Sequence, residues 1–475
     1  MNRKIILLYA IFLWLIPVTC PAAPWYTDDR IAVKIRADKL EWYRHQMVEP
    51  YKQIGHSNPR WDKYAITAME SMALHWSEST TRQRDELFVG YHSAIEAIEN
   101  GCTDPLIAYI MGKAGYDIGC MADSDATGWY VKAAQGMQES NYPAGIKIWS
   151  FIRAATFLLK SKTPTAENQN MALDFLNKAQ SLLPQVVKDP GVTYNDWYNI
   201  SGFMWDARKK LKEPLAKIYE DFYAILKQSG AGDSLLYMIE GRYYYDSIKE
   251  HRVYDYKKNT REIQARFELY DSALEALSKS WHEDPSNPVA PAMCIPCVLA
   301  IEPDRSEMEI WFQRSVAADP YYYEAYLLKL QWLNPGYNGS KHEMMVFARE
   351  CIKKRNWESQ VPLIIFDAHY DLCRLNSRKS RKLQTSYYHD QEIWQEIKYL
   401  MQVYLSHYPE DHEKRNLFAL VACWAEDWET ANEQFQRLGK NIQCARFNDE
   451  ASYLQWREKA EKYAKKTKET ARPTN

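Results

Sequence analysis

A repeated pattern in the second half of the chain is the feature that most constrains its fold. The run Leu277-Ser278-Lys279-Ser280 leads into Asp284-Pro285, and 35 positions later Phe312-Gln313-Arg314-Ser315 leads into Asp319-Pro320. Proline lacks an N–H group and disfavours helical geometry in the residue before it, so each Asp-Pro pair stops one helix and can open the next. This periodicity is typical of stacked helix-turn-helix repeats.

Two further segments extend the repeat toward the C-terminus. Phe347-Ala348-Arg349 follows after another 35 positions, and Phe435-Gln436-Arg437 lies on an expected helix after the turn Glu426-Asp427. A single helix pair cannot bury its apolar face alone, so such units stack on their neighbours. We therefore expect residues 273–438 to form consecutive antiparallel helix pairs.

Composition agrees with an all-α chain and excludes some partners. Of 475 residues, 46% are hydrophobic and 26% are charged, and only 17 are glycine. The net charge of −2 provides no global field for nucleic acid or an anionic membrane. Tyrosine (34) and tryptophan (17) are abundant, which makes aromatic surfaces worth locating.

Apolar residues at helical spacing extend the helical prediction over most of the chain. The turn Ser229-Gly230-Ala231-Gly232 before Asp233 suggests a division into an N-terminal helical region, residues 23–229, and a C-terminal region, residues 233–475. An Asp N-cap followed by Pro, as at Asp104-Pro105, is a typical helix start. Expected helices include 38–54, 60–76, 82–99, 126–138, 143–159, 166–187, one run from 192 to about 228, 235–249, 341–352, 362–375, 391–407, 416–425, 428–438 and 450–466.

The first 22 residues have the pattern of a secretory signal peptide. Arg3 and Lys4 precede an apolar run over residues 5–18, and small residues follow at Ala22 and Ala23. A run of about 14 apolar residues is short for a membrane span, which needs about 20. We expect cleavage after Ala22 and location in the periplasm or outside the cell; the alternative is lipidation of Cys20. No later stretch is apolar enough to predict a membrane span in the mature chain.

Several short motifs resemble a known family. Cys102-Thr103-Asp104-Pro105-Leu106, Asn141-Tyr142-Pro143 and the turn at 317–320 share a plan with the loop 335–340 and with residues 426–431. Together they look like uncharacterised bacterial helical-repeat proteins of the DUF4034 type, similar in style to tetratricopeptide repeats. The resemblance implies an α-solenoid of tetratricopeptide-like antiparallel helix pairs, and no reaction. In that family the loop usually reads Pro-x-Trp-Gly-Gly-Ser, whereas here it reads Pro335-Gly336-Tyr337-Asn338-Gly339-Ser340.

Cysteines offer one candidate for covalent chemistry. Cys294-Ile295-Pro296-Cys297 could be a disulfide, a pair of reduced core thiols, or a redox or metal site, and Pro296 is expected to break the helix that holds it. Redox chemistry of this motif needs a preceding strand, and a metal site needs a second ligand pair. Neither is found in the sequence, so we expect no metal and no cofactor.

Motifs for catalysis are sparse. There is no His-Glu-x-x-His pair, no Gly-x-Ser-x-Gly elbow and no phosphate-binding loop. Glu139-Ser140 resembles the Glu-Ser opening of lytic transglycosylases, but the Gly-Leu-Met-Gln segment that follows it there is absent here. No catalytic residue is predicted.

Aromatic clusters are the remaining candidates for function. Consecutive helical residues point in different directions, so a Tyr triplet places at least one ring outside the core. Exposed Tyr and Trp favour recognition surfaces, although such rings can also fill gaps between helices. The candidate binding residues are Trp197, Tyr198, Tyr244, Tyr322, Tyr326 and Tyr337.

These observations favour an exported, non-enzymatic scaffold that binds a protein or peptide partner in the cell envelope. The alternative is a cell-wall or glycan-acting enzyme on a helical scaffold. An open aromatic groove would favour binding, whereas a closed pocket with converging carboxylates would favour catalysis.

Overall fold

The computed structural model describes residues 28–78, 83–250, 260–353, 357, 359–377, 386–439, 442, 447 and 450–470. Over these residues all regular structure is helical and no strand occurs. The predicted all-α fold is therefore confirmed. The signal peptide predicted over residues 1–22, Cys20 included, lies outside the described residues.

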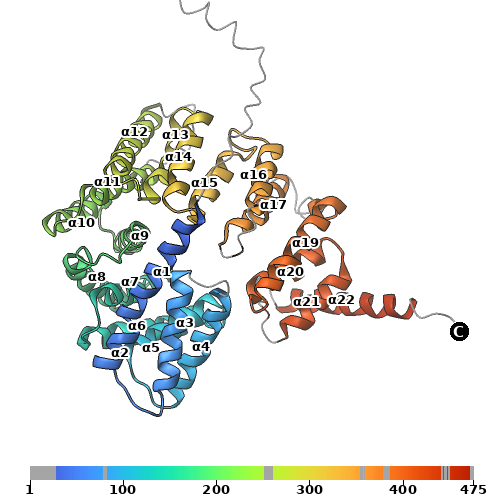
Figure 1. Cartoon of the computed structure of the whole chain (residues 1–475), viewed down its shortest axis with the longest axis horizontal. Helices are drawn as coiled ribbons and strands as arrows, with labels where there is room; N and C mark the ends of the chain where they lie inside the picture. Colours follow the sequence, from blue (N-terminus) through green and yellow to red (C-terminus); the bar gives the residue numbers. More distant parts are fainter. Residues whose placement is uncertain are drawn as a thin grey trace, which may run out of the picture.

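The helices follow one another with short turns between them (Figure 1). The first half contains α1 (Asp29–Gln46), α2 (Val48–Ile54), α3 (Asp62–Ser77), α4 (Gln83–Glu99), α5 (Pro105–Asp117), α6 (Asp123–Glu139), α7 (Ala144–Leu158), α8 (Ala166–Val186), α9 (Tyr194–Lys210) and α10 (Leu215–Gln228). The second half contains α11 (Asp233–Ser247), α12 (Thr260–Glu283), α13 (Val289–Ile301), α14 (Arg305–Ala318), α15 (Tyr323–Trp332), α16 (Lys341–Lys353), α17 (Ile364–Ser377), α19 (Gln391–His407), α20 (His412–Trp424), α21 (Trp428–Leu438) and α22 (Glu450–Thr470).

Aspartate caps set many of these helix starts. The Asp104 side chain accepts a hydrogen bond from the Leu106 N–H at 2.9 Å, with Pro105 at the first helical position, as predicted. Asp304, Asp390, Asp411 and Asp427 cap later helices in the same way. These side chains satisfy backbone donors that have no partner within the helix.

Most helices pack on the next one along the chain, which produces the solenoid. The most extensive contacts join neighbours in the chain, such as α3 with α4, α5 with α6, α7 with α8 and α11 with α12. Their buried side chains form one contiguous core that extends from Tyr43 to Ala460. The chain is an all-α solenoid of tetratricopeptide-like helix pairs.

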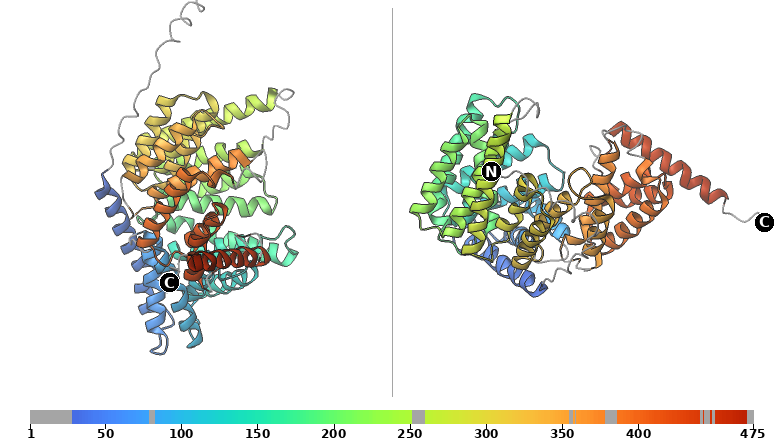
Figure 2. Two further views of the ribbon diagram at one scale, coloured as in Figure 1. Left: turned by 90° about the vertical axis from the view of Figure 1, so that its right-hand side faces the viewer. Right: turned by 90° about the horizontal axis from the view of Figure 1, so that it is seen from above.

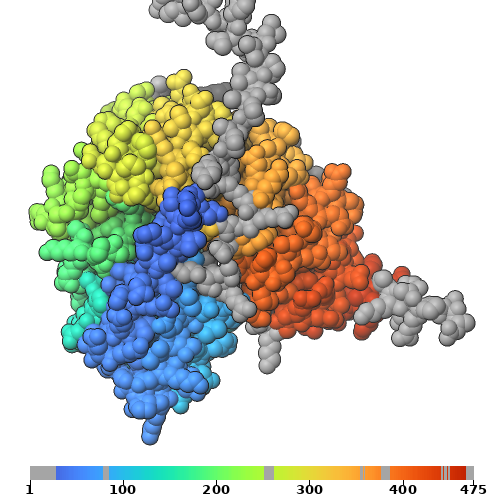
Figure 3. All heavy atoms as spheres, in the orientation of Figure 1, coloured from blue at the N-terminus to red at the C-terminus, as the bar shows by residue number. Residues whose placement is uncertain are grey.

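The solenoid is curved, and its two ends are arranged differently. Helices α3 to α15 wind around a common centre, while α16 to α22 continue to one side and α22 projects outward (Figures 1 and 2). Helix α1 packs on α3 and also reaches past it toward α14 and α15 (Figure 3). Arg36 of α1 contacts Asp319 in the turn that follows α14. The first helix therefore bridges distant repeats.

Several expected helix boundaries were wrong. The first helix begins at Asp29, not at residue 38, and a new helix starts at Val48 after Met47. The run expected from 192 to 228 is two helices, because Lys212 has a positive φ of 70° and Pro214 follows it. Pro296 lies within α13 and does not end it.

The turn between α10 and α11 coincides with the predicted division at residues 229–233. Gly230 has a φ of 84° there, which glycine adopts without the steric strain that a side chain would add. Helices α10 and α11 nevertheless pack on each other, and core residues on both sides belong to the same cluster. The division into two regions stays a prediction.

Candidate binding groove

A cavity of about 730 Å³ lies where α1 faces two turns of the solenoid. One turn joins α8 to α9, and the other joins α14 to α15; the end of α3 also contributes. We call this cavity the inner groove. The aromatic residues that line it are Tyr43, Trp76, Tyr194, Trp197, Tyr198, Tyr321, Tyr322 and Tyr323.

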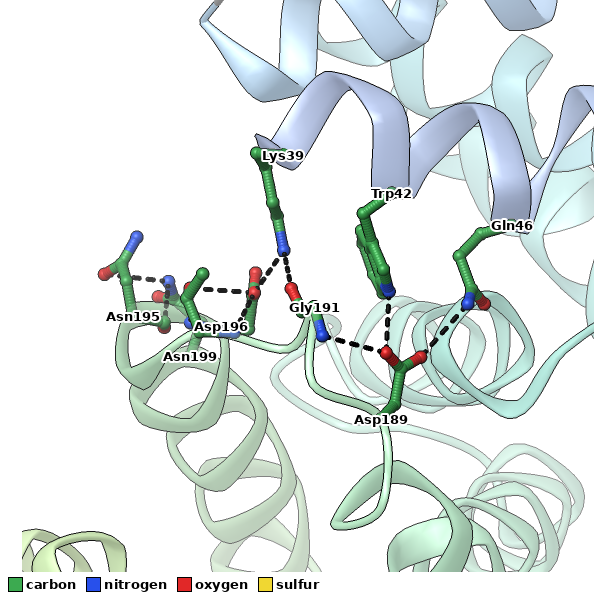
Figure 4. Close-up of polar contacts among 9 residues, drawn as sticks. Lys39, Trp42, Gln46, Asp189, Gly191, Asn195, Asp196 and Asn199 are labelled. Carbon is green, nitrogen blue, oxygen red and sulfur yellow. Dashed lines mark hydrogen bonds and ion pairs between the residues drawn. The ribbon is translucent and has the colours of Figure 1, made fainter. Parts of the chain in front are cut away.

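One face of α1 holds this helix against the α8–α9 turn beside the inner groove. Lys39, Trp42 and Gln46 are three and four residues apart, so their side chains lie on the same side of the helix. Figure 4 shows all three pointing toward the α8–α9 turn. The Trp42 indole N–H donates to Asp189 at 2.8 Å, and the Gln46 amide donates to the other oxygen of that carboxylate at 3.0 Å.

Lys39 anchors the same helix to the start of α9. Its ammonium group donates to the Gly191 carbonyl oxygen at 2.9 Å and to the Asp196 carboxylate at 2.5 Å. A side chain at position 191 would not fit, because an added Cβ would lie 1.9 Å from Trp42 Cδ1. Gly191 therefore permits the close approach of the turn to α1.

The α8–α9 turn is also organised from within. Thr193 and Asp196 form a capping box: the Asp196 N–H donates to Thr193 Oγ1 at 3.2 Å, and the Thr193 N–H donates to Asp196 Oδ2 at 2.8 Å. The Gly191 N–H donates to Asp189 at 3.0 Å. One turn of helix away, Asn199 donates to the Asn195 carbonyl oxygen at 2.9 Å (Figure 4). Both carboxylates that contact α1 are thus also held by hydrogen bonds within the turn.

Arg36 connects α1 to the α14–α15 turn. Its guanidinium group lies 2.7 Å from Asp319 Oδ1 and 3.4 Å from Glu78 Oε2, and it stacks 5.0 Å from the Tyr321 ring centroid. Asp319 also accepts the Tyr321 N–H at 2.9 Å. Burial raises the pKa of the Glu78 carboxyl, and the nearby Arg36 charge partly opposes that rise.

Three of the six candidate aromatic residues lie in this groove. Trp197 is largely buried, whereas Tyr198 and Tyr322 are partly exposed. The Arg242 guanidinium stacks 4.0 Å from the Tyr198 ring centroid, and Tyr322 is the N-cap residue of α15. Burial raises the pKa of the Tyr322 hydroxyl well above its ordinary value, so Tyr322 is a neutral hydrogen-bonding group.

The other three candidates lie elsewhere. Tyr326 is 1% exposed; its hydroxyl donates to the Pro320 carbonyl oxygen and its ring packs against Phe312, so its interpretation as a surface residue was wrong. Tyr244 is partly buried on α11 beside Tyr243. Tyr337 is 55% exposed on the loop before α16. Neither Tyr244 nor Tyr337 lines the groove.

The α1 residues of the groove were not predicted. Arg36, Lys39 and Tyr43 form a basic and aromatic face, a signal present in the sequence. The positions of Asp189 and Asp319 opposite that face depend on how the repeats curve, which the local pattern does not specify.

Cys294 and Cys297 are both free and fully buried in α13. The Cys297 thiol donates to the Met293 carbonyl oxygen at 3.4 Å, and burial raises the pKa of both thiols. The structure therefore has free core thiols at the motif for which a disulfide was one of the alternatives. The helix continues through the motif because its side chains pack inside the core.

Metal sites and membrane-spanning helices are two other features with clear structural requirements. Over the described residues, no His, Cys, Asp and Glu side chains gather in a group of three or more that could hold a metal ion. Within the same part of the chain, no helix combines the length and apolarity that crossing a membrane requires.

No family model and no curated protein matches this chain. The resemblance to DUF4034-type proteins accordingly stays a prediction. Among solved structures, the chain is similar to the human IFIT1 dimer with PPP-AAAA, at 14% identity over 87% of this chain and 95% of that one, with a TM-score of 0.32. It is also similar to yeast Tom70, at 13% identity over 92% and 96%, with a TM-score of 0.26. The Cut9–Hcn1 hetero-tetramer of APC/C matches at 12% identity over 91% and 98%, with a TM-score of 0.17. At such values these likenesses carry no argument about ligands.

Proposed function

We propose that this chain is an exported, non-enzymatic scaffold whose inner groove binds a segment of a protein or peptide partner in the cell envelope. The observation that carries the proposal is the groove itself, a cavity of about 730 Å³ lined by aromatic rings from three distant parts of the solenoid. Aromatic side chains provide large contact areas with few rotatable bonds, which suits recognition.

The groove carboxylates that hold α1 in place favour binding over catalysis, whereas Glu324 makes no such contact with the described part of the chain. Asp319 and Asp196 form ion pairs with Arg36 and Lys39, and Asp189 accepts three hydrogen bonds from Trp42, Gln46 and Gly191. A general acid or base needs access to a substrate proton. Asp319, Asp196 and Asp189 already bind side chains of α1, so they do not have free access to a substrate proton. The DUF4034-type resemblance and the location in the envelope belong to the proposal and rest on the sequence motifs.

A random peptide display library tests the binding function. Peptides selected on the folded protein are synthesised with a fluorescent label, and their affinity is measured by anisotropy. We expect Tyr322→Ser to weaken binding about tenfold, because it removes a ring from the groove wall. The matched control is Tyr399→Ser, since Tyr399 is 64% exposed on α19 and does not line the groove. Selection of no peptide, or equal binding by both variants, would overturn the proposal.

Export is tested separately. When the full chain is expressed in a bacterial host with its own N-terminus, we expect the mature protein in the periplasmic fraction to begin at Ala23. Intact mass spectrometry of that fraction distinguishes this outcome from a lipid-modified chain beginning at Cys20. An unprocessed chain in the cytoplasm would contradict the export proposal and would leave the binding proposal unaffected.

A further inference from the structure

The lining of the inner groove has an excess of negative charge. Two cations, Arg36 and Lys39, face five carboxylates, which are Glu78, Asp189, Asp196, Asp319 and Glu324. A groove with one predominant sign of charge attracts ligands of the opposite sign and disfavours those of the same sign. The groove therefore favours a cationic ligand and disfavours a nucleic acid.

The two cations do not neutralise all of these carboxylates. Lys39 pairs with Asp196, and Arg36 pairs at 2.7 Å with Asp319 and at 3.4 Å with Glu78. Asp189 is held by neutral donors only. Within the described residues, Glu324 makes no hydrogen bond or ion pair, and it lies in the first turn of α15, next to Tyr322 and Tyr323. Glu324 is thus an acceptor open to a ligand.

Aromatic rings around the groove already serve as platforms for cations. The Lys39 ammonium lies 3.8 Å from the centroid of the Trp42 ring, and the Arg36 guanidinium lies 5.0 Å from that of Tyr321. Arg242 stacks at 4.0 Å on Tyr198 from the neighbouring helix α11. Cations over Trp and Tyr faces are attracted by the ring quadrupole. The groove combines rings and carboxylates, the two groups that recognise Lys and Arg side chains.

Helix α1 is an internal example of such a ligand. Its face toward the groove presents Arg36 and Lys39, and each inserts between a carboxylate and an aromatic ring. The part of the groove beside Glu324 offers the same pair of groups without an internal cation in contact with that carboxylate. A basic segment from a partner would extend the set of contacts that α1 begins.

We propose that the groove selects a peptide segment that carries Lys or Arg, with Glu324 as its principal anionic contact and the ring of Tyr322 beside it. This inference rests on the proposed binding function and adds the chemical class of the ligand. The recognition is by charge pairing with Glu324, whose side chain is exposed in the first turn of α15.

Selection from the same peptide library tests the charge preference. The pools recovered on the wild-type protein, on Glu324→Gln and on Glu302→Gln are sequenced and compared with the starting library. Glu302 is an exposed glutamate at the end of α13, away from the groove lining, so its substitution is the matched control. We expect enrichment of Lys and Arg on the wild type and on the control, and loss of that enrichment on Glu324→Gln.

Affinities provide the second measurement. For a selected basic peptide we expect Glu324→Gln to weaken binding about tenfold, which corresponds to loss of one charge-assisted contact. Replacing the Lys and Arg residues of the peptide by Gln should have a similar effect. If the selected peptides bind less tightly to Tyr322→Ser but show no preference for Lys or Arg, this inference is overturned and the binding function remains supported. Groove-dependent binding of a labelled single-stranded RNA oligonucleotide would also overturn it.

Discussion

Arg36 and Asp319 are 283 positions apart in the sequence, yet their side chains form an ion pair at 2.7 Å that is about 90% shielded from solvent. The pair joins the first helix to the turn between α14 and α15. Removing one partner of a buried pair leaves the other charge desolvated and uncompensated, and the effect is usually about 3 kcal/mol or more.

Arg36→Met should therefore lower the free energy of unfolding by about 3 kcal/mol. We expect faster hydrogen exchange in α1 and a lower urea midpoint followed by tryptophan fluorescence. Lys34→Met is the control, because Lys34 pairs with Asp38 on the exposed face of the same helix and should change stability by less than about 0.5 kcal/mol. The double variant Arg36→Met/Asp319→Leu should recover part of the loss, and equal effects of Arg36→Met and Lys34→Met would contradict the assignment.

We expect the Glu396 carboxylate, at the junction between α16, α17 and α19, to make a pH-dependent contribution to the free energy of unfolding. It accepts hydrogen bonds from Arg349 at 2.8 and 3.0 Å, and His369 Nε2 lies 3.4 Å from its carboxylate. The contact with His369 first, and then those with Arg349, lower the pKa of the Glu396 carboxyl to about 2. A lowered pKa stabilises the folded state above the unfolded value near 4.5, and the stabilisation is lost as the pH falls toward 2.

We expect Glu396→Gln to destabilise the protein by about 2 kcal/mol at pH 7, and the difference from the wild type to shrink to about half by pH 3. Urea unfolding at both pH values measures this. This value is smaller than the full effect of the pKa shift, because Arg349 is half exposed and solvent screens its charge. A difference that is constant between pH 7 and pH 3 would show that charge at Glu396 is not the cause.

The burial of each cysteine predicts how readily its thiol is alkylated. Cys294 and Cys297 are buried with raised thiol pKa values, so they should resist alkylation by iodoacetamide at pH 8 until the protein unfolds. Cys120 is exposed and should react first, although its pKa is also somewhat raised. Mass spectrometry of the digested protein measures the extent of alkylation at each cysteine. Recovery of a peptide with a Cys294–Cys297 disulfide from non-reduced native protein would contradict the free-thiol assignment.

Two glycines on α6 form a matched pair for packing. An added Cβ at Gly136 would lie 2.8 Å from Pro105 Cβ on α5, whereas at Gly128 it would meet no atom within 4 Å. Gly128→Ala should raise stability by about 0.5–1 kcal/mol, because alanine loses less backbone entropy in a helix. Gly136→Ala should lower stability, because α5 and α6 would have to separate. Thermal unfolding compares the two, and a shared direction of change would contradict this packing.

The sequence predicts the helices well because their signals are local. The Asp104-Pro105 start and the pairs beyond residue 273 follow from capping, proline geometry and apolar spacing. The break between α9 and α10 was missed although Pro214 marks it, because the apolar spacing on each side masks the stop. Pro214 is the residue in the sequence that indicates this break.

The groove is harder to predict because its parts meet only through the curvature of the whole solenoid. Trp197, Tyr198 and Tyr322 were singled out as aromatic residues, but no local pattern shows that they face one cavity. Tyr326 belongs to the same tyrosine-rich stretch and lies in the core, because it is on the inner side of α15. Small rotations between successive helices add up over many repeats, and they decide which turn α1 reaches.

The bridge formed by α1 changes how this solenoid should respond to force and heat. An open repeat array behaves like a spring, since each unit contacts only its neighbours and can fray independently from either end. Here the N-terminal unit is fastened to the turns at Asp189 and Asp319. Stretching the array must first break these contacts of α1, so we expect α1 and the middle of the array to unfold together.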